Sequence, residues 1–101
     1  MKTFRSYDLA VSFYRATQTV KLPGYVKNQF LRASLSIPLN LREGRGRRTL
    51  ADQLRFFQIA MGSIREVQSI VELHGDAFSA EHIETLDRLA ASIYLLTKRA
   101  R

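Results

Sequence analysis

Residues 32–48 read RASLSIPLNLREGRGRR, and this stretch largely decides the fold. Ala33, Ile37 and Leu41 recur at every fourth position, so they share one face of a helix. Pro38 lies inside this pattern and, because it removes a backbone donor, it predicts a kink. The stretch ends in a cluster of arginines: Arg42, Arg45, Arg47 and Arg48. It therefore predicts a helix that buries one side and carries positive charge at its end.

The chain has 101 residues, which suffice for one core, so residues 1–101 are predicted to form a single domain. The absence of cysteine excludes a disulfide scaffold and a cysteine-ligated zinc site. The first residues lack the apolar segment of a signal peptide, and no apolar run is long enough to span a membrane. From these features we expect a cytoplasmic protein.

Positive charge is concentrated in one part of the sequence. Sixteen lysines and arginines exceed nine acidic residues, which gives a net charge of +7. Residues 1–65 carry an excess of nine positive charges, whereas residues 66–101 carry an excess of two negative charges. A localised basic excess is typical of proteins that bind phosphate groups of nucleic acids. The simpler interpretation is that the charge only keeps the protein soluble.

Helical spacing continues on both sides of the opening stretch. Helices are predicted over residues 6–19, 25–43, 49–74 and 79–98. Ser6, Thr49 and Ser79 are the expected N-cap residues of the first, third and fourth helices. Gly44 and Gly46 are expected to end the second helix, because glycine favours this position. The short connections place successive helices antiparallel. The prediction is an all-α, up-down-up-down four-helix bundle.

The third predicted helix is apolar on more than one side. Most of its apolar residues share one broad face, but Ile59, Ile70 and Leu73 fall on nearly the opposite side. A helix of this kind is either central in a protein or shared with another subunit. These three residues are therefore the candidate interface of a homo-oligomer.

With the second and third helices in view, the sequence resembles a family of small bacterial four-helix-bundle proteins. These are the intervening-sequence 23S ribosomal RNA proteins, whose fold is shared by the accessory variability proteins of diversity-generating retroelements. The similarity is carried by R-A-S-x-S-I-P-x-N-x-x-E-G at residues 32–44 and F-x-I-A-x-G-S-x-x-E at residues 57–66. Arg42 departs from the pattern, because a small residue is usual at this position.

The resemblance implies a bundle that commonly assembles as a pentamer. For the retroelement branch it also implies a basic surface that binds nucleic acid and a reverse transcriptase as partner. Function is less well defined across the rest of the family, so the fold transfers more securely than the role.

Six arginines are the candidate nucleic-acid-binding residues: Arg32, Arg42, Arg45, Arg47, Arg48 and Arg55. Guanidinium groups match phosphate oxygens in a bidentate geometry, and nearby glycines would let a backbone approach. The alternative is a solvated loop whose arginines pair with Glu43 and Asp52. Two local carboxylates are too few to neutralise all of these charges.

Eight residues of the two sequence motifs have a structural interpretation. They are Ser36, Pro38, Asn40, Glu43, Gly44, Gly62, Ser63 and Glu66. Ser36 and Asn40 are expected to satisfy backbone groups that Pro38 leaves unpaired, and Arg32 is expected to pair with a carboxylate such as that of Glu66. Gly62 and Ser63 are expected to let a neighbouring helix approach closely.

Nothing in the sequence indicates catalysis, a metal site or a cofactor. The two histidines lack further ligands at helical spacing, and no nucleophile lies in a recognisable context. The sequence therefore predicts a non-enzymatic, homo-oligomeric bundle that binds RNA, or RNA and DNA. A scaffold that docks an acidic protein is the alternative, and a helix-turn-helix DNA reader fits less well because the predicted helices are long.

Overall fold

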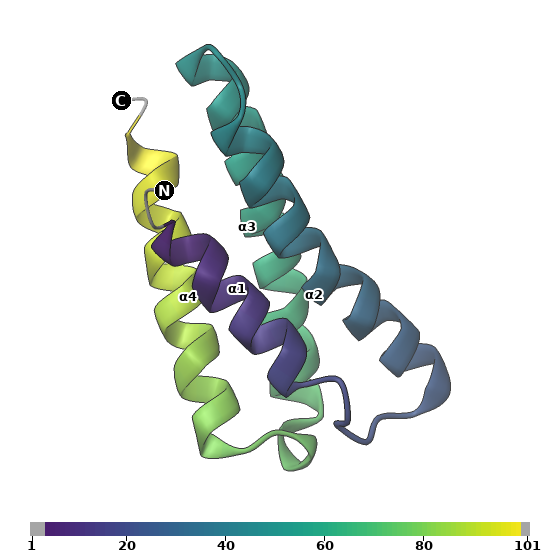
Figure 1. Ribbon diagram of the computed structural model, residues 1–101. Helices are drawn as coiled ribbons and strands as arrows, with labels where there is room; N and C mark the ends of the chain where they lie inside the picture. The colour runs from purple at the N-terminus through teal and green to yellow at the C-terminus, as the bar shows by residue number, and fades with distance from the viewer. Residues whose placement is uncertain (1–3, 100–101) are drawn as a thin grey trace.

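The computed structural model describes residues 4–99, which form a four-helix bundle (Figure 1). The helices are α1 (Arg5–Ala16), α2 (Gly24–Arg45), α3 (Leu50–Leu73) and α4 (Ala80–Lys98). A short 3-10 helix, η1 (Gly75–Ala77), connects α3 to α4. There is no strand between residues 4 and 99. The predicted all-α architecture is therefore confirmed, with η1 as an addition that the sequence pattern did not indicate.

The helices pack as a closed ring of neighbours. α1 contacts α2 and α4, and α3 also contacts α2 and α4. The start of α1, the α2–α3 connection and the end of α4 all lie toward one end of the bundle (Figure 1). This arrangement follows from the antiparallel order, and it brings basic segments from different parts of the sequence to the same end.

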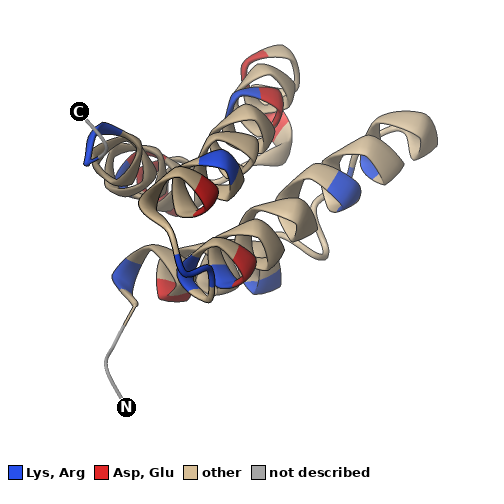
Figure 2. Ribbon diagram, turned by 90° about the horizontal axis from the view of Figure 1, so that it is seen from above, with Lys and Arg blue, Asp and Glu red and all other residues tan. Residues whose placement is uncertain are grey.

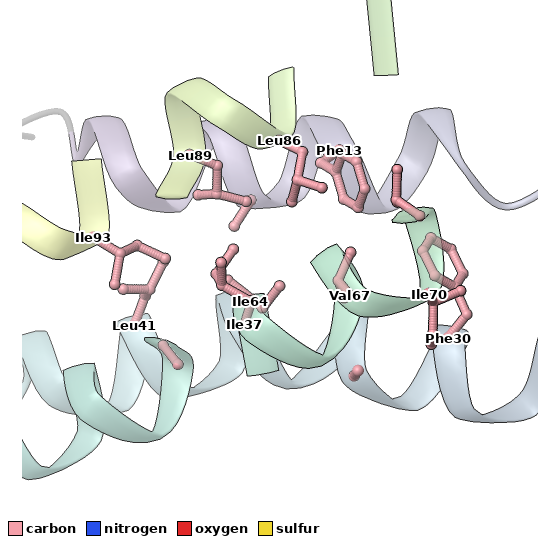
Figure 3. Packing of buried hydrophobic residues seen from close by; sticks show 14 of the residues in the cluster. Phe13, Phe30, Ile37, Leu41, Ile64, Val67, Ile70, Leu86, Leu89 and Ile93 are labelled. Carbon is pink, nitrogen blue, oxygen red and sulfur yellow. The ribbon is translucent and has the colours of Figure 1, made fainter. Parts of the chain in front are cut away.

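A continuous apolar core runs between the helices (Figure 3). Each helix contributes large side chains that are almost completely buried, among them Phe13 on α1, Ile37 on α2, Ile64 on α3 and Leu89 on α4. The apolar face predicted for α2 is confirmed, because Phe30, Ala33, Ile37 and Leu41 are all buried. Burial of a side chain of this size stabilises the fold by about 1.5–3 kcal/mol.

Two of the three predicted helix caps are confirmed. The hydroxyl group of Thr49 accepts a hydrogen bond from the backbone N–H of Asp52, and that of Ser79 accepts one from His82. The Ser6 prediction is wrong, because α1 begins at Arg5 and Ser6 lies inside the helix. Ser6 is buried and its hydroxyl hydrogen-bonds the hydroxyl of Ser92 on α4. Its polar group therefore serves helix packing rather than capping.

Of the two glycines expected to end α2, Gly46 is confirmed as its C-cap, whereas Gly44 lies inside the helix, which continues to Arg45. Gly44 is buried inside the helix, and a Cβ atom there would lie 2.8 Å from Cε1 of Phe57 and 2.9 Å from Cβ of Phe56. The glycine is thus required by the close approach of α3, not by a helix end. Pro38 is also buried within α2, and the helix continues on both sides of it.

Candidate nucleic-acid interface

Five of the six candidate arginines surround the α2–α3 connection. Arg42 and Arg45 are in the last turns of α2, Arg47 and Arg48 lie in the connection, and Arg55 follows early in α3. We call this group of five the arginine end, and Figure 2 shows its basic segments from above. The sixth residue, Arg32, lies ten positions before Arg42 on α2, about 15 Å along the helix axis. The structure therefore does not place Arg32 with the other five.

Aromatic rings at the start of α1 support two of these side chains, Tyr7 from within the helix and Phe4 from its N-cap position. The Cζ atom of Arg42 lies over the ring of Tyr7, 4.7 Å from its centroid. The Cζ atom of Arg45 lies over the ring of Phe4, 4.5 Å from its centroid. A guanidinium group over an aromatic face is stabilised by the ring quadrupole, which restricts the otherwise mobile side chain. The start of α1 therefore helps to hold the end of α2 and its charges.

Phe56 on α3 supports two further arginines. The Cζ atom of Arg47 lies 4.7 Å from the centroid of this ring, and that of Arg55 lies 4.5 Å from it. Neither Phe4 nor Phe56 was among the predicted site residues. Phe56 is adjacent to Arg55 in the sequence, so its presence near the arginines could have been predicted. The position of Phe4 beside Arg45 depends on how α1 packs against α2 and could not.

Ion pairs neutralise only part of the arginine end. Arg47 pairs with Glu43 at 2.8 Å, and Arg55 approaches Asp52 at 3.9 Å. The interpretation of the arginines as partners of two local carboxylates therefore holds for these two residues. Arg42, Arg45 and Arg48 form no ion pair with any residue between 4 and 99. Their charges remain available to an external anion.

A shallow cavity of about 290 Å³ lies between α1, α2, α3 and the end of α4. Its lining includes the side chains of Arg45 and Arg99 together with Gln53, and no acidic residue lines it. Arg99 was not among the predicted site residues, because it is far from Arg45 along the chain. Antiparallel packing brings the two together. Two arginines beside a hollow without a carboxylate suit the binding of a phosphate group.

The polar motif of α2 connects this helix to α3. The side-chain amide of Asn40 donates to the carbonyl oxygen of Ser36 at 2.9 Å and to its hydroxyl at 3.0 Å. The Ser63 hydroxyl hydrogen-bonds that of Ser36 at 2.9 Å. Asn40 thus satisfies the Ser36 carbonyl, and not the Ser34 carbonyl that Pro38 leaves without its helical donor. The expectation that these residues satisfy the group freed by Pro38 is therefore wrong, and their hydrogen bonds instead form a network that connects α2 to α3.

Two expectations about other motif residues are wrong. Arg32 and Glu66 form no ion pair, since the pairs found among residues 4–99 involve other side chains. Gly62 does not admit a neighbouring helix of its own chain, because a Cβ atom there would have no atom within 4 Å. Gly62 is exposed and lines an open hollow of about 310 Å³ beside Tyr94.

The three candidate interface residues do not share one surface. Ile59 and Leu73 are exposed, with 44% and 79% of their surface accessible, whereas only 7% of Ile70 is accessible. Ile70 belongs to the core near Phe30 (Figure 3). It is buried because α3 is covered on more than one side within the bundle. The prediction that Ile70 belongs to an intersubunit face is therefore wrong.

Other kinds of site receive no support from the described part of the chain. Among residues 4–99, no three histidine or acidic side chains are grouped so that they could hold a metal ion. In the same residues, no helix is both long and apolar enough to cross a membrane. The arginine end is therefore the strongest candidate site of this structure.

The sequence also matches a described family over nearly its whole length. The match covers residues 3–98, and the family is described as 23S rRNA-intervening sequence protein. No curated protein is significantly similar to this chain. The family match agrees with the four-helix bundle and with the two motifs on α2 and α3. The chain therefore belongs to the 23S rRNA-intervening sequence protein family.

Proposed function

We propose that this protein is a non-enzymatic, homo-oligomeric bundle that binds RNA through its arginine end. The observation that carries the proposal is the gathering of Arg42, Arg45 and Arg48 at one end of the bundle without ion pairs among residues 4–99. Arginine forks bind phosphate oxygens strongly, and neutralising phosphates releases counterions from the nucleic acid. The same surface would therefore bind an RNA backbone with little dependence on sequence.

The positions of Arg45 and Arg99 support one particular phosphate contact. Both residues line the shallow cavity at the end of the bundle, and Gln53 lies beside them. A phosphate seated there would receive charge from α2 and α4 at once. Arg48 is exposed in the α2–α3 connection, so it would then contact a neighbouring phosphate of the RNA backbone.

RNA is the favoured nucleic acid because of the family to which the chain belongs. The family description refers to 23S rRNA, and a contact with RNA is the simplest role that agrees with it. A reverse-transcriptase partner is the finer expectation of the retroelement branch. It would dock on the same basic surface, and co-purification of the two proteins would test this part of the proposal.

Homo-oligomerisation is supported by apolar residues that the single chain leaves exposed. Leu39 on α2, Ile59 on α3 and Leu95 on α4 each expose 44% or more of their surface. A pentamer, which the family resemblance implies, would bring several arginine ends together and strengthen RNA binding by multivalency. Light scattering coupled to size-exclusion chromatography measures the mass of the assembly and tests this state directly.

Charge reversal tests RNA binding at the arginine end. The variant Arg42→Glu/Arg45→Glu/Arg48→Glu leaves the Arg47–Glu43 ion pair in place. The matched control, Arg15→Glu/Arg65→Glu/Arg88→Glu, replaces three exposed arginines on other parts of the bundle. Both variants remove the same amount of positive charge, so they separate a local site from a general attraction.

The expected result is a loss of RNA binding in the first variant only. Fluorescence anisotropy with a labelled RNA that contains a hairpin and single-stranded flanks measures the affinity, and circular dichroism checks that both variants are folded. Equal losses in the two variants would show that net charge alone attracts RNA. Undetectable RNA binding by the unaltered protein would contradict the proposal and favour a scaffold that docks an acidic protein.

A further inference from the structure

We infer that the arginine end binds unpaired bases by stacking, and therefore prefers single-stranded to double-stranded RNA. This inference rests on the proposed RNA binding and specifies the kind of RNA and the kind of contact. It starts from the four guanidinium groups that lie 4.5–4.7 Å from the centroids of three aromatic rings. A surface that acted by charge alone would not need these groups to be held in fixed places.

Three of the four arginines, Arg42, Arg45 and Arg55, remain exposed although a ring lies against each, whereas Arg47 is half-buried and paired with Glu43. The side chain of Arg55 keeps 59% of its surface accessible while it lies over Phe56. A guanidinium group is flat and positively charged, so the accessible part of these side chains is a suitable surface for the face of a nucleobase.

The arrangement also lowers the entropic cost of binding. A free arginine side chain loses much rotamer freedom when a base stacks on it. Here the aromatic ring has already restricted the side chain. Tyr7 and Phe4 lie one turn apart near the start of α1 and hold Arg42 and Arg45 in neighbouring positions. The neighbouring stacks could therefore receive successive bases of one strand.

A duplex cannot use these surfaces, because its bases are already stacked and paired inside the helix. It can contact only the charged edges of the arginines through its phosphates. An unpaired strand can use both the edges and the accessible flat surfaces. The geometry therefore favours single-stranded segments, loops or ends, with phosphates at Arg48 and in the cavity beside Arg99.

An abasic strand separates stacking from charge. We compare a single-stranded oligonucleotide with an abasic strand of the same length, which has the same phosphates but no bases. The expected result is that the base-bearing strand binds at least roughly tenfold more tightly, since each stacked base contributes a factor of this order. Equal affinities for the two strands would overturn the inference and leave charge-based RNA binding intact. No binding of either strand would contradict both.

Lysine substitution tests the same point within the protein. The variant Arg42→Lys/Arg45→Lys/Arg55→Lys keeps every charge but removes the planar groups, and Arg15→Lys/Arg65→Lys/Arg88→Lys is the matched control. The first variant is expected to lose the preference for the base-bearing strand and to bind the abasic strand as before. An unchanged preference in this variant would overturn the inference. The control is expected to behave like the unaltered protein.

Discussion

Gly44 lies directly against the ring of Phe57, so that a Cβ atom at Gly44 would stand 2.8 Å from Cε1 of that ring. This close approach fixes the crossing of α2 and α3 immediately before the arginine end begins. The same residue is a glycine for packing reasons, since no glycine between residues 4 and 99 has a positive φ angle. Helix packing at Gly44 thus positions the charged groups that follow it.

The variant Gly44→Ala is expected to destabilise the protein by about 1–3 kcal/mol, as overpacked cores do. Alanine gains about 1 kcal/mol in helix propensity, but the clash with Phe57 and with the backbone-proximal Cβ of Phe56 cannot be relieved by a flexible side-chain end. Urea unfolding measures the change. An unchanged or higher free energy of unfolding would show that the two helices are not held this closely.

The variant Gly62→Ala makes the same substitution on α3 at a glycine that has no close neighbour among residues 4–99. A Cβ atom at Gly62 would meet no other atom within 4 Å, so only helix propensity changes and the fold is expected to gain about 1 kcal/mol. The same urea titration measures it. A loss of stability, together with a lower mass in light scattering, would reveal that a second copy packs against Gly62 and would contradict its exposed position.

The hydrogen bond between Ser63 and Ser36 is expected to contribute about 1 kcal/mol to stability. Removing it in Ser63→Ala should lower the free energy of unfolding by that amount. Ser69→Ala is the control, because among residues 4–99 the Ser69 hydroxyl bonds only the carbonyl of Arg65 in its own helix. Equal effects of the two substitutions would mean that the α2–α3 hydrogen bond adds nothing specific.

Phe56 is expected to affect RNA binding without touching RNA. Phe56→Leu retains apolar volume but removes the ring beneath Arg47 and Arg55, each contact being worth about 0.5–1 kcal/mol at an exposed site. Affinity for single-stranded RNA should fall severalfold, and anisotropy measures this. Tyr94→Leu provides the control, because the ring of Tyr94 lies against Lys98, which is not part of the arginine end. Identical affinities in both variants would contradict the role of Phe56.

Much of the fold could be predicted from local sequence rules. Thr49 and Ser79 cap helices as their side-chain chemistry requires, and the apolar spacing of α2 correctly identified its buried face. The errors arose where tertiary contacts override local rules. Gly44 has the sequence signature of a helix end but serves a helix crossing, and Ile70 falls on a second side of α3 that the bundle also covers.

The candidate site was predictable only in part. The arginines adjoin one another in the sequence, so their cluster was visible without a structure. Phe4 and Arg99 come from opposite ends of the chain, and they join Arg45 only because α1 packs against both α2 and α4. Short connections indicate that successive helices are antiparallel, and periodicity indicates their buried faces, but neither determines which side chain lies beneath a given guanidinium group.

The salt dependence of RNA affinity tests the central claim most directly. For a single strand, each phosphate contacted by the arginine end should contribute about −0.7 to the slope of the logarithm of the association constant against the logarithm of the salt concentration. With three to five such contacts we expect a slope of about −2 to −4, and a clearly shallower slope for Arg42→Glu/Arg45→Glu/Arg48→Glu. A slope near zero, or the same slope in both proteins, would contradict RNA binding at the arginine end.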